Sequence, residues 1–207
     1  MINAMPPVVS FTDEQRFRLA VHEAGHAVLG HTLRPESLVK VTICSVRPLG
    51  ARWTQIGTTE FSYSLPLFAT ASDFEKNITI FLGGMAAERI VFGEHSTSAG
   101  GDVAADLCLA TDAATLMERS FGFGKGLLAD LGSGGRPLES LRLADRALQE
   151  SVRRRLDVLF KRATETLELM RSEVEKRAAQ LAVSAEEVRS ICEPGLGRME
   201  SRERVAS

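Results

Sequence analysis

Apolar residues recur at helical spacing in the first part of the chain, between Thr12 and Leu33. Thr12 and Gln15 stand three residues apart, the spacing at which two side chains cap a helix N-terminus reciprocally. Arg34 and Pro35 follow as a stop signal. The positions that share one helical face are Phe17, Ala20, Val21, Ala24, Val28 and Leu29. The pattern therefore predicts an amphipathic helix that ends near Leu33.

The pattern changes over residues 38 to 63 to β-branched and aromatic residues. Val39, Val41 and Ile43 alternate with polar neighbours, which is typical of a strand with one buried face. Residues 47 to 50 contain a proline and a glycine and are predicted to form a turn. We therefore expect a small antiparallel sheet here.

A second helix is predicted over Asp73–Phe92, where helical spacing returns. Ser72 and Glu75 repeat the capping spacing, and Gly93 is typical of a helix C-terminus. The pair Gly83-Gly84 costs stability inside a helix, so we expect another helix to pass closely at this point.

The remaining segments predict a helical second half. A polar loop, Glu94–Gly101, leads to a helix from about Asp102 to Ser120, and residues 129 to 137 are predicted to form a linker. One or two charged, leucine-rich amphipathic helices are expected over residues 138 to 181, and a short one over residues 184 to 192.

These elements together predict a mainly α fold with a small antiparallel β-sheet, an α+β fold that ends in a helical bundle. We expect a flexible N-terminus over residues 1 to 11 and one domain over residues 12 to 193. That domain would consist of a first half, residues 12 to 128, and a helical half, residues 138 to 193. The tail, residues 194 to 207, is expected to be disordered.

Composition narrows the class of protein. The 207 residues carry a net charge of -2, which gives no general attraction to nucleic acid or to anionic lipid. The three cysteines, Cys44, Cys108 and Cys192, lack the spacing of a disulfide framework or a thiolate zinc site. We find neither a signal peptide nor an apolar stretch of roughly 18 residues. A soluble, cytoplasmic protein that does not insert into a membrane is expected.

The residues His22, Glu23 and His26 form an HExxH motif within the first predicted helix. Two histidines four residues apart project from one helix face, about 5 to 6 Å apart, and can converge on a tetrahedral ion. Glu23 is rotated off that axis, so it is better placed to take a proton from a water on the ion. Ordinary core or surface histidines are the alternative, but two of only four histidines fall at this spacing with an acid between them.

Zinc needs a third protein ligand, and a catalytic site keeps one position open. His31 lies about 180° around the helix from His22 and is expected to be a structural or surface residue. The residues alone leave four candidates open for the third ligand: Glu88, His95, Asp102 and Asp106.

Five segments, in order and spacing, resemble the peptidase domain of the FtsH-type ATP-dependent zinc metalloproteases. They are His22–Ala27, Val39–Ile43, Gly83–Glu88, Asp106–Thr111 and Phe121-Gly122. The string His-Glu-Ala-Gly-His-Ala and the Gly-Gly-x-x-Ala-Glu helix are specific in combination, whereas the C-terminal helices match only in pattern. The resemblance implies a zincin-like helix for the HExxH motif, and it assigns residues 12 to 128 to the metal-site half.

The resemblance also implies a ligand set. The family's third zinc ligand is an aspartate at the start of a helix that continues with Ala-Thr, and Asp106 matches it. Asp102, one helical turn earlier, is the alternative ligand and would otherwise be a helix N-cap. Glu88 is implied to orient a histidine ring from outside the ligand set. The family often has a second acid next, where this chain has Arg89.

The activity implied is that of a zinc metalloendopeptidase with one Zn²⁺ per chain, acting on unfolded proteins or peptides. Zinc would lower the pKa of its water, and Glu23 would take the proton and return it to the leaving amine. Family substrates are thought to lie extended along a sheet edge, which suits a strand near Ile56–Phe61. Family members carry an ATPase module before this domain, whereas this chain begins almost at the HExxH helix. The implied partners are therefore further copies in a ring, commonly a hexamer, and a separate AAA+ ATPase.

A catalytically idle, zinc-stabilised module that binds an ATPase or a protease ring is the main alternative. It is disfavoured because Glu23 has no evident structural task and because a structural zinc is normally closed by four protein ligands. A peptidase specific for one partner protein fits the same residues as a general peptidase.

Overall fold

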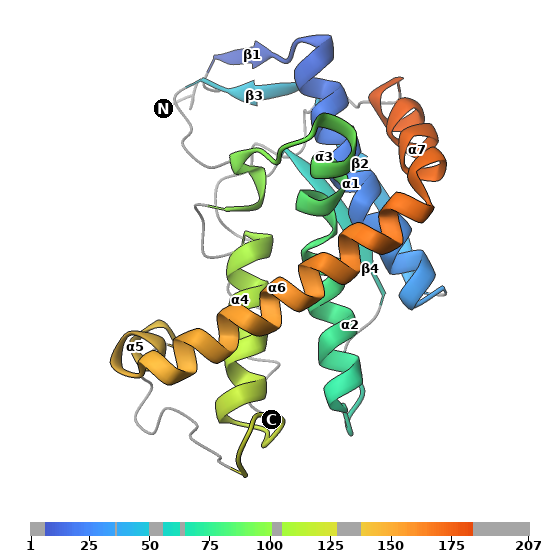
Figure 1. Ribbon diagram of the computed structural model, residues 1–207. Helices are drawn as coiled ribbons and strands as arrows, with labels where there is room; N and C mark the ends of the chain where they lie inside the picture. The colour runs from blue at the N-terminus through green and yellow to red at the C-terminus, as the bar shows by residue number, and fades with distance from the viewer. Residues whose placement is uncertain are drawn as a thin grey trace.

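The computed structural model describes residues 7–35, 37–49, 56–62, 65–100, 105–127 and 138–183 (Figure 1). The predicted linker over residues 129 to 137, the predicted helix over 184 to 192 and the tail from residue 194 lie outside these ranges. Within them the fold is mainly α with short antiparallel strands, as the sequence predicts.

Helix α1 (Asp13–Leu33) is the central element of the fold. The Thr12 side chain accepts a hydrogen bond from the backbone N–H of Gln15, and the Gln15 side chain accepts one from the Thr12 N–H, which confirms the predicted capping box. Twelve consecutive residues, 19 to 30, are buried, so the middle of α1 is enclosed on all sides. The helix ends at Leu33 as expected, with Arg34 as its C-cap.

Within the described residues the strands form two antiparallel pairs rather than one sheet. Strand β2 (Leu38–Ile43) pairs with β4 (Gly57–Phe61), and β1 (Val8–Ser10) pairs with β3 (Val46–Pro48). The prediction of a turn over residues 47 to 50 is therefore wrong for Arg47 and Pro48. Residues 8 to 10, assigned from the sequence to a flexible N-terminus, are held in a strand by pairing with a segment almost forty residues away.

The predicted second helix is divided into α2 (Ala71–Phe81) and α3 (Gly83–Phe92), with Leu82 between them. The capping residue is Thr70, which forms a capping box with Asp73, so the predicted box of Ser72 and Glu75 is wrong by two residues. Gly93, with φ of 82°, ends α3 as predicted.

The two glycines at the start of α3 allow the close helix contact that the sequence predicts. A Cβ atom on Gly25 of α1 would lie 2.3 Å from the Gly83 carbonyl oxygen and 2.5 Å from the Ala87 Cβ. Because these distances are far below van der Waals contact, α1 and α3 cross at a separation that only glycine permits.

Helix α4 (Asp106–Arg119) follows a short 3-10 helix, η1 (Thr97–Ala99). Its first residue is Asp106, four residues later than the predicted start at Asp102. Residues 101 to 104, and Asp102 with them, lie outside the described ranges. At the other end, Gly122 has a φ of 67°, a backbone conformation that favours glycine.

Over the described residues 138–183, where one or two helices were predicted, the chain forms three: α5 (Leu138–Ala144), α6 (Arg146–Leu169) and α7 (Arg171–Val183). Figure 1 shows α6 crossing the molecule over α4 and α2, with α7 lying beside α1. Two core clusters meet along α6: Leu159 packs with α2 and α4, whereas Ala163 and Leu167 pack with α1 and α3.

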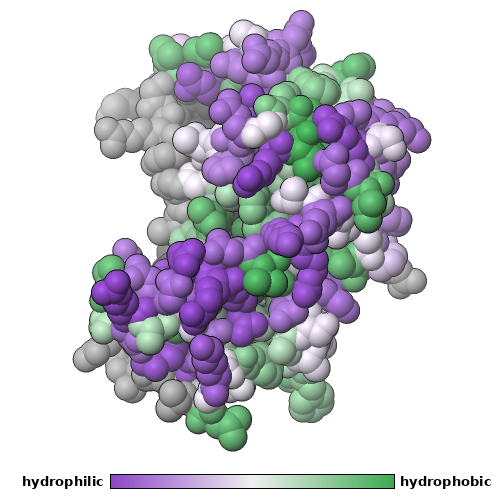
Figure 2. All heavy atoms as spheres, viewed as in Figure 1, coloured by the Kyte–Doolittle hydropathy of each residue, from purple (hydrophilic) through white to green (hydrophobic). Residues whose placement is uncertain are grey.

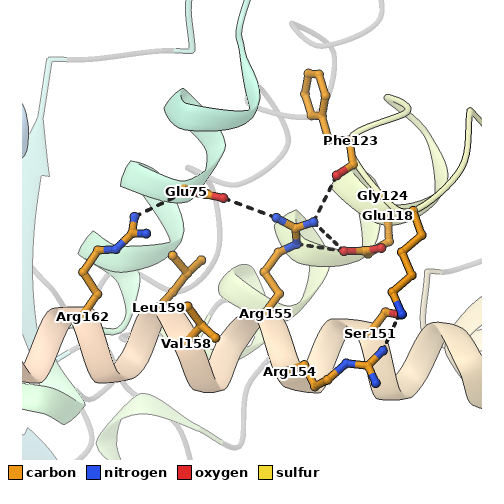
Figure 3. A pocket seen from close by; sticks show the side chains of 11 residues that line it. Glu75, Glu118, Phe123, Gly124, Ser151, Arg154, Arg155, Val158, Leu159 and Arg162 are labelled. Carbon is orange, nitrogen blue, oxygen red and sulfur yellow. Dashed lines mark hydrogen bonds and ion pairs between the residues drawn. The ribbon is translucent and has the colours of Figure 1, made fainter.

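Arg155 joins α6 to α2 and α4 in a groove of about 400 Å³ (Figure 3). Its guanidinium donates hydrogen bonds to Glu118 at 2.6 and 2.9 Å and to the Phe123 carbonyl oxygen at 3.1 Å, and it lies 3.5 Å from Glu75. The Arg155 and Glu118 side chains are 18% and 10% exposed. This half-buried network therefore fixes how α6 lies across the other two helices.

The outer surface of α5 and α6 is largely hydrophilic (Figure 2). On α6, Arg153 forms ion pairs with Glu150 and Asp157, as the predicted amphipathic character requires. None of the helices in the described part of the chain combines the length and apolar character that crossing a lipid bilayer requires.

Candidate metal centre

The two histidines of the HExxH motif lie on adjacent turns of α1, with their ring centroids 4.9 Å apart. Both rings are buried. The His26 Nδ1 atom lies 2.7 Å from the Ile80 carbonyl oxygen, and the His22 Nδ1 atom lies 2.8 Å from the Glu88 Oε1 atom. Because a carbonyl and a carboxylate only accept, each Nδ1 carries the proton. When the rings are neutral, as in a metal complex, the lone pairs of both Nε2 atoms are therefore presented to the same side.

Asp106, the first residue of α4, brings a carboxylate to these two nitrogens. Its Oδ2 atom lies 3.1 Å from the His22 Nε2 atom and 3.2 Å from the His26 Nε2 atom, and the two Nε2 atoms lie 3.2 Å apart. The three donor atoms thus form a nearly equilateral triangle. Among the residues that the structure describes, these three are the group of side chains that could hold a metal ion.

Glu88 on α3 lies directly behind His22 and is fully buried. Besides the His22 ring, its carboxylate accepts hydrogen bonds from the Ser96 N–H at 2.8 Å and from the Ser98 hydroxyl at 2.8 Å. Arg18 on α1 adds a weaker contact at 3.4 Å. Sequence reasoning missed Ser96 and Ser98, because short serine runs in a loop carry no signal that separates them from ordinary caps.

These carboxylates favour the charged form of the rings. Burial acts to lower the pKa of His22, but hydrogen bonds with Asp106 and Glu88 outweigh it and raise this pKa to about 10. The pKa of His26 is raised as well, against the effect of burial, by the Asp106 charge. Burial acts to raise the pKa of the Glu88 and Asp106 carboxyls, but the facing histidines outweigh it. The pKa of Glu88 falls to about 2, and that of Asp106 lies well below its usual value. The site is thus built to stabilise positive charge.

Glu23 lies on the side of α1 that faces β4 and is almost fully buried. The Thr59 hydroxyl lies 2.7 Å from the Glu23 Oε2 atom, and a Cβ atom at Gly57 would lie only 2.3 Å from the Oε1 atom. Sequence reasoning missed both residues of β4. Strand alternation places residues 57, 59 and 61 on one face, but the pattern does not reveal that this face packs on α1.

His95 and His31 do not lie at the triangle. His95 is exposed, and its Nδ1 atom lies 3.2 Å from the Ser96 carbonyl oxygen. His31 is exposed near the end of α1, in agreement with the expected surface role. The structure does not describe Asp102, so the choice between Asp102 and Asp106 has geometric support only for Asp106.

An HExxH helix with two converging imidazoles, a carboxylate from a second helix and a buried glutamate beside them is the metal-centre architecture of zincin-type peptidases. Sequence comparison identifies the group within this class. Residues 9–191 match the sequence profile of peptidase family M41, and the chain belongs to that family.

Similar proteins include three that are named ATP-dependent zinc metalloprotease FtsH. The FtsH 2 protein of Symbiobacterium thermophilum is 30% identical over 178 residues, which cover 82% of this chain and 28% of that protein. The FtsH 1 protein of Sorangium cellulosum is 30% identical over 146 residues, which cover 70% of this chain and 23% of that protein. The FtsH protein of Mesomycoplasma conjunctivae is 37% identical over 115 residues, covering 54% of this chain and 14% of that protein. The matched region thus spans between a seventh and somewhat over a quarter of these relatives.

Proposed function

We propose that this chain is a zinc metalloendopeptidase whose metal is held by His22, His26 and Asp106. The observation that carries the proposal is the donor triangle, with sides of 3.1, 3.2 and 3.2 Å. Ligands about 2.0 to 2.1 Å from a tetrahedral zinc lie about 3.3 to 3.4 Å from one another. The three donors therefore fit one face of such a tetrahedron, and the fourth position stays open for water or substrate.

The surroundings of the triangle support the same assignment. Each ring is fixed through its Nδ1 atom, His22 by Glu88 and His26 by the Ile80 carbonyl oxygen, as is usual for histidines that bind zinc through Nε2. Because these partners hold the rings in place, little reorganisation is needed when the metal binds. Glu88 acts here as a positioning residue.

Zinc, when bound, polarises a water molecule and the scissile carbonyl and lowers the pKa of that water toward neutrality. Glu23 accepts a proton from the water while the water oxygen bonds to the carbonyl carbon. The same side chain then protonates the nitrogen as the C–N bond breaks, so one carboxylate serves as base and acid. The products are a new carboxyl terminus and a new amine terminus.

Unfolded polypeptides are the proposed substrates, because an extended chain can place its backbone against the strands beside α1. The relatives are named ATP-dependent, which supports an AAA+ ATPase as the functional partner, and we propose that the chain acts in a homo-oligomeric ring.

Metal analysis and a cleavage assay with Glu23→Gln test the function together. We expect about one zinc per chain, lost in the double variant His22→Ala and His26→Ala, and cleavage of a casein-like unfolded substrate. Glu23→Gln should keep its zinc and lose turnover by at least about 100-fold, because only the proton acceptor is removed. If the double histidine variant retains its zinc, the proposed metal site is wrong. A zinc-loaded but inert wild type would instead favour a zinc-stabilised interaction module.

A further inference from the structure

Strand β4 presents one face to helix α1 along its whole length. Phe61 lies against Gly30, where a Cβ atom would come within 2.1 Å of the ring, and Gly57 lies against the Glu23 carboxylate. Thr59, between them on the same face, points its hydroxyl at Glu23. The strand is thus fitted to the helix at the turn that carries the general base and again two turns later.

The Thr59 hydroxyl is the donor that fixes one end of this carboxylate. It lies 2.7 Å from the Glu23 Oε2 atom and 3.2 Å from the Glu23 backbone oxygen, and the shorter contact to the charged group is the stronger one. The Oε1 atom lies over Gly57, where a Cβ atom would approach it to 2.3 Å. The missing side chain at residue 57 therefore leaves the space that this oxygen occupies.

We infer that Thr59 is a positioning residue of the peptidase: its hydroxyl orients the Glu23 carboxylate, and Gly57 leaves the space that this carboxylate needs. With Oε2 engaged by the hydroxyl, rotation of the carboxylate is restricted and Oε1 is left as the oxygen that exchanges protons with the reacting groups. This inference rests on the function proposed above. It predicts that the hydroxyl contributes to turnover without contacting the metal, the water or the substrate.

The first test separates kcat from KM in three variants. Thr59→Val removes the hydroxyl at constant shape and should lower kcat about 10- to 100-fold, with KM and zinc content unchanged. Thr59→Ser keeps the donor and should retain kcat within about threefold. Thr42→Val makes the same chemical change on the neighbouring strand β2 and should leave kcat unchanged.

Gly57→Ala perturbs the same carboxylate from the other side. The added methyl group meets the far end of the flexible Glu23 side chain, so the carboxylate moves while the strand stays in place. We expect kcat to fall at least about tenfold with little loss of thermal stability.

The second test needs neither metal nor activity. In metal-free protein, unfolding constants are measured for wild type, Thr59→Val, Glu23→Met and the double variant. If the hydroxyl bonds to the carboxylate, the two single changes should not act independently. The unfolding constant of the double variant should then differ at least about fivefold from the value that the product of the two single effects predicts.

The outcomes separate this inference from the function beneath it. The role of Thr59 is overturned, and the peptidase assignment left intact, if Thr59→Val has wild-type kcat. The same holds if the unfolding constant of the double variant agrees within about twofold with the product of the two single effects. A zinc-loaded wild type that cleaves nothing overturns the peptidase and the positioning role with it, whatever the coupling.

Discussion

Gly84 on α3 supplies no ligand, yet replacing it with alanine should disrupt the metal centre. A Cβ atom at this position would lie 2.4 Å from the His22 Cε1 and Nε2 atoms and 2.6 Å from the Cδ2 atom. Carbon and nitrogen atoms at ordinary contact are separated by about 3.5 Å or more, so the ring must move by roughly 1 Å. Coordination distances tolerate only about ±0.2 Å. The displaced Nε2 atom would therefore no longer complete the donor triangle.

We expect Gly84→Ala to weaken zinc binding about 100-fold or more, since even the loss of a partner outside the ligand set costs 10- to 100-fold. The measurement is competition against a chelator of known zinc affinity, with far-UV circular dichroism to establish that the helices are retained. Gly100→Ala is the matched control, because a Cβ atom at Gly100 has no neighbour within 4 Å and its backbone is extended. A folded Gly84→Ala protein that binds zinc within about threefold of wild type would refute the close approach of α3 to the His22 ring.

Three further predictions concern stability. Gly25→Ala forces α1 and α3 apart against backbone atoms, which should cost about 3 kcal/mol and lower the melting temperature by about 6 to 12 °C in calorimetry. Arg155→Met leaves the Glu118 carboxylate half-buried without its main partner and should cost about 2 to 3 kcal/mol in denaturant unfolding, part of which the added change Glu118→Gln should restore. Metal-free protein should lose stability as the pH rises from 6.5 toward 10, because the raised pKa of His22 gives a contribution that is complete below the unfolded value of 6.5 and is lost toward about 10. Zinc-loaded protein holds that ring neutral, so its melting temperature should not follow the same decline, and parallel curves would contradict the assignment of His22 as a ligand.

The elements that could be predicted from the sequence are those with local causes. The capping box of Thr12 and Gln15 and the helical stripe of α1 depend on residues three or four positions apart, and both are confirmed. The close passage at Gly83 could be predicted because glycine pairs inside helices need a reason outside the helix. The HExxH motif is also local: once the helix is known, the four-residue spacing places both histidines on one helix face.

The elements that could not be predicted have causes at a distance. Strand β1 exists only because Val8 to Ser10 pair with residues 46 to 48, and no local pattern announces that pairing. The predicted second helix is divided at Leu82, directly before Gly83, whose carbonyl oxygen is the backbone atom nearest to a Cβ at Gly25 of α1. The capping box at the start of α2 is formed by Thr70 and Asp73 rather than by the predicted Ser72 and Glu75, and Glu75 instead forms ion pairs with Arg155 and Arg162 of α6.

The third corner of the donor triangle shows the same limit. Residues alone left Asp106 open among four acids and histidines, and only the family resemblance favoured it, because 84 positions separate Asp106 from His22. The fold supplies what the motif lacks: α4 brings the Asp106 carboxylate to the histidines, α3 brings Glu88 to His22, and β4 brings Thr59 to Glu23, the proposed general base.

Because the site is assembled from four elements of the fold, we expect the fold to hold the site residues in place even without the metal. The Nδ1 atoms of His22 and His26 are engaged by Glu88 and by the Ile80 carbonyl oxygen, and these contacts lie beside core clusters built from aliphatic side chains. In metal-free protein, a proton on His22 can offset the two facing carboxylates in place of the cation. The helices should therefore persist when zinc is removed by a chelator, in contrast to small zinc domains that unfold without their metal. In the proposed mechanism the metal supplies the chemistry at the open position, and the packing of α1 against α3, α4 and β4 supplies the preorganisation of the residues around it.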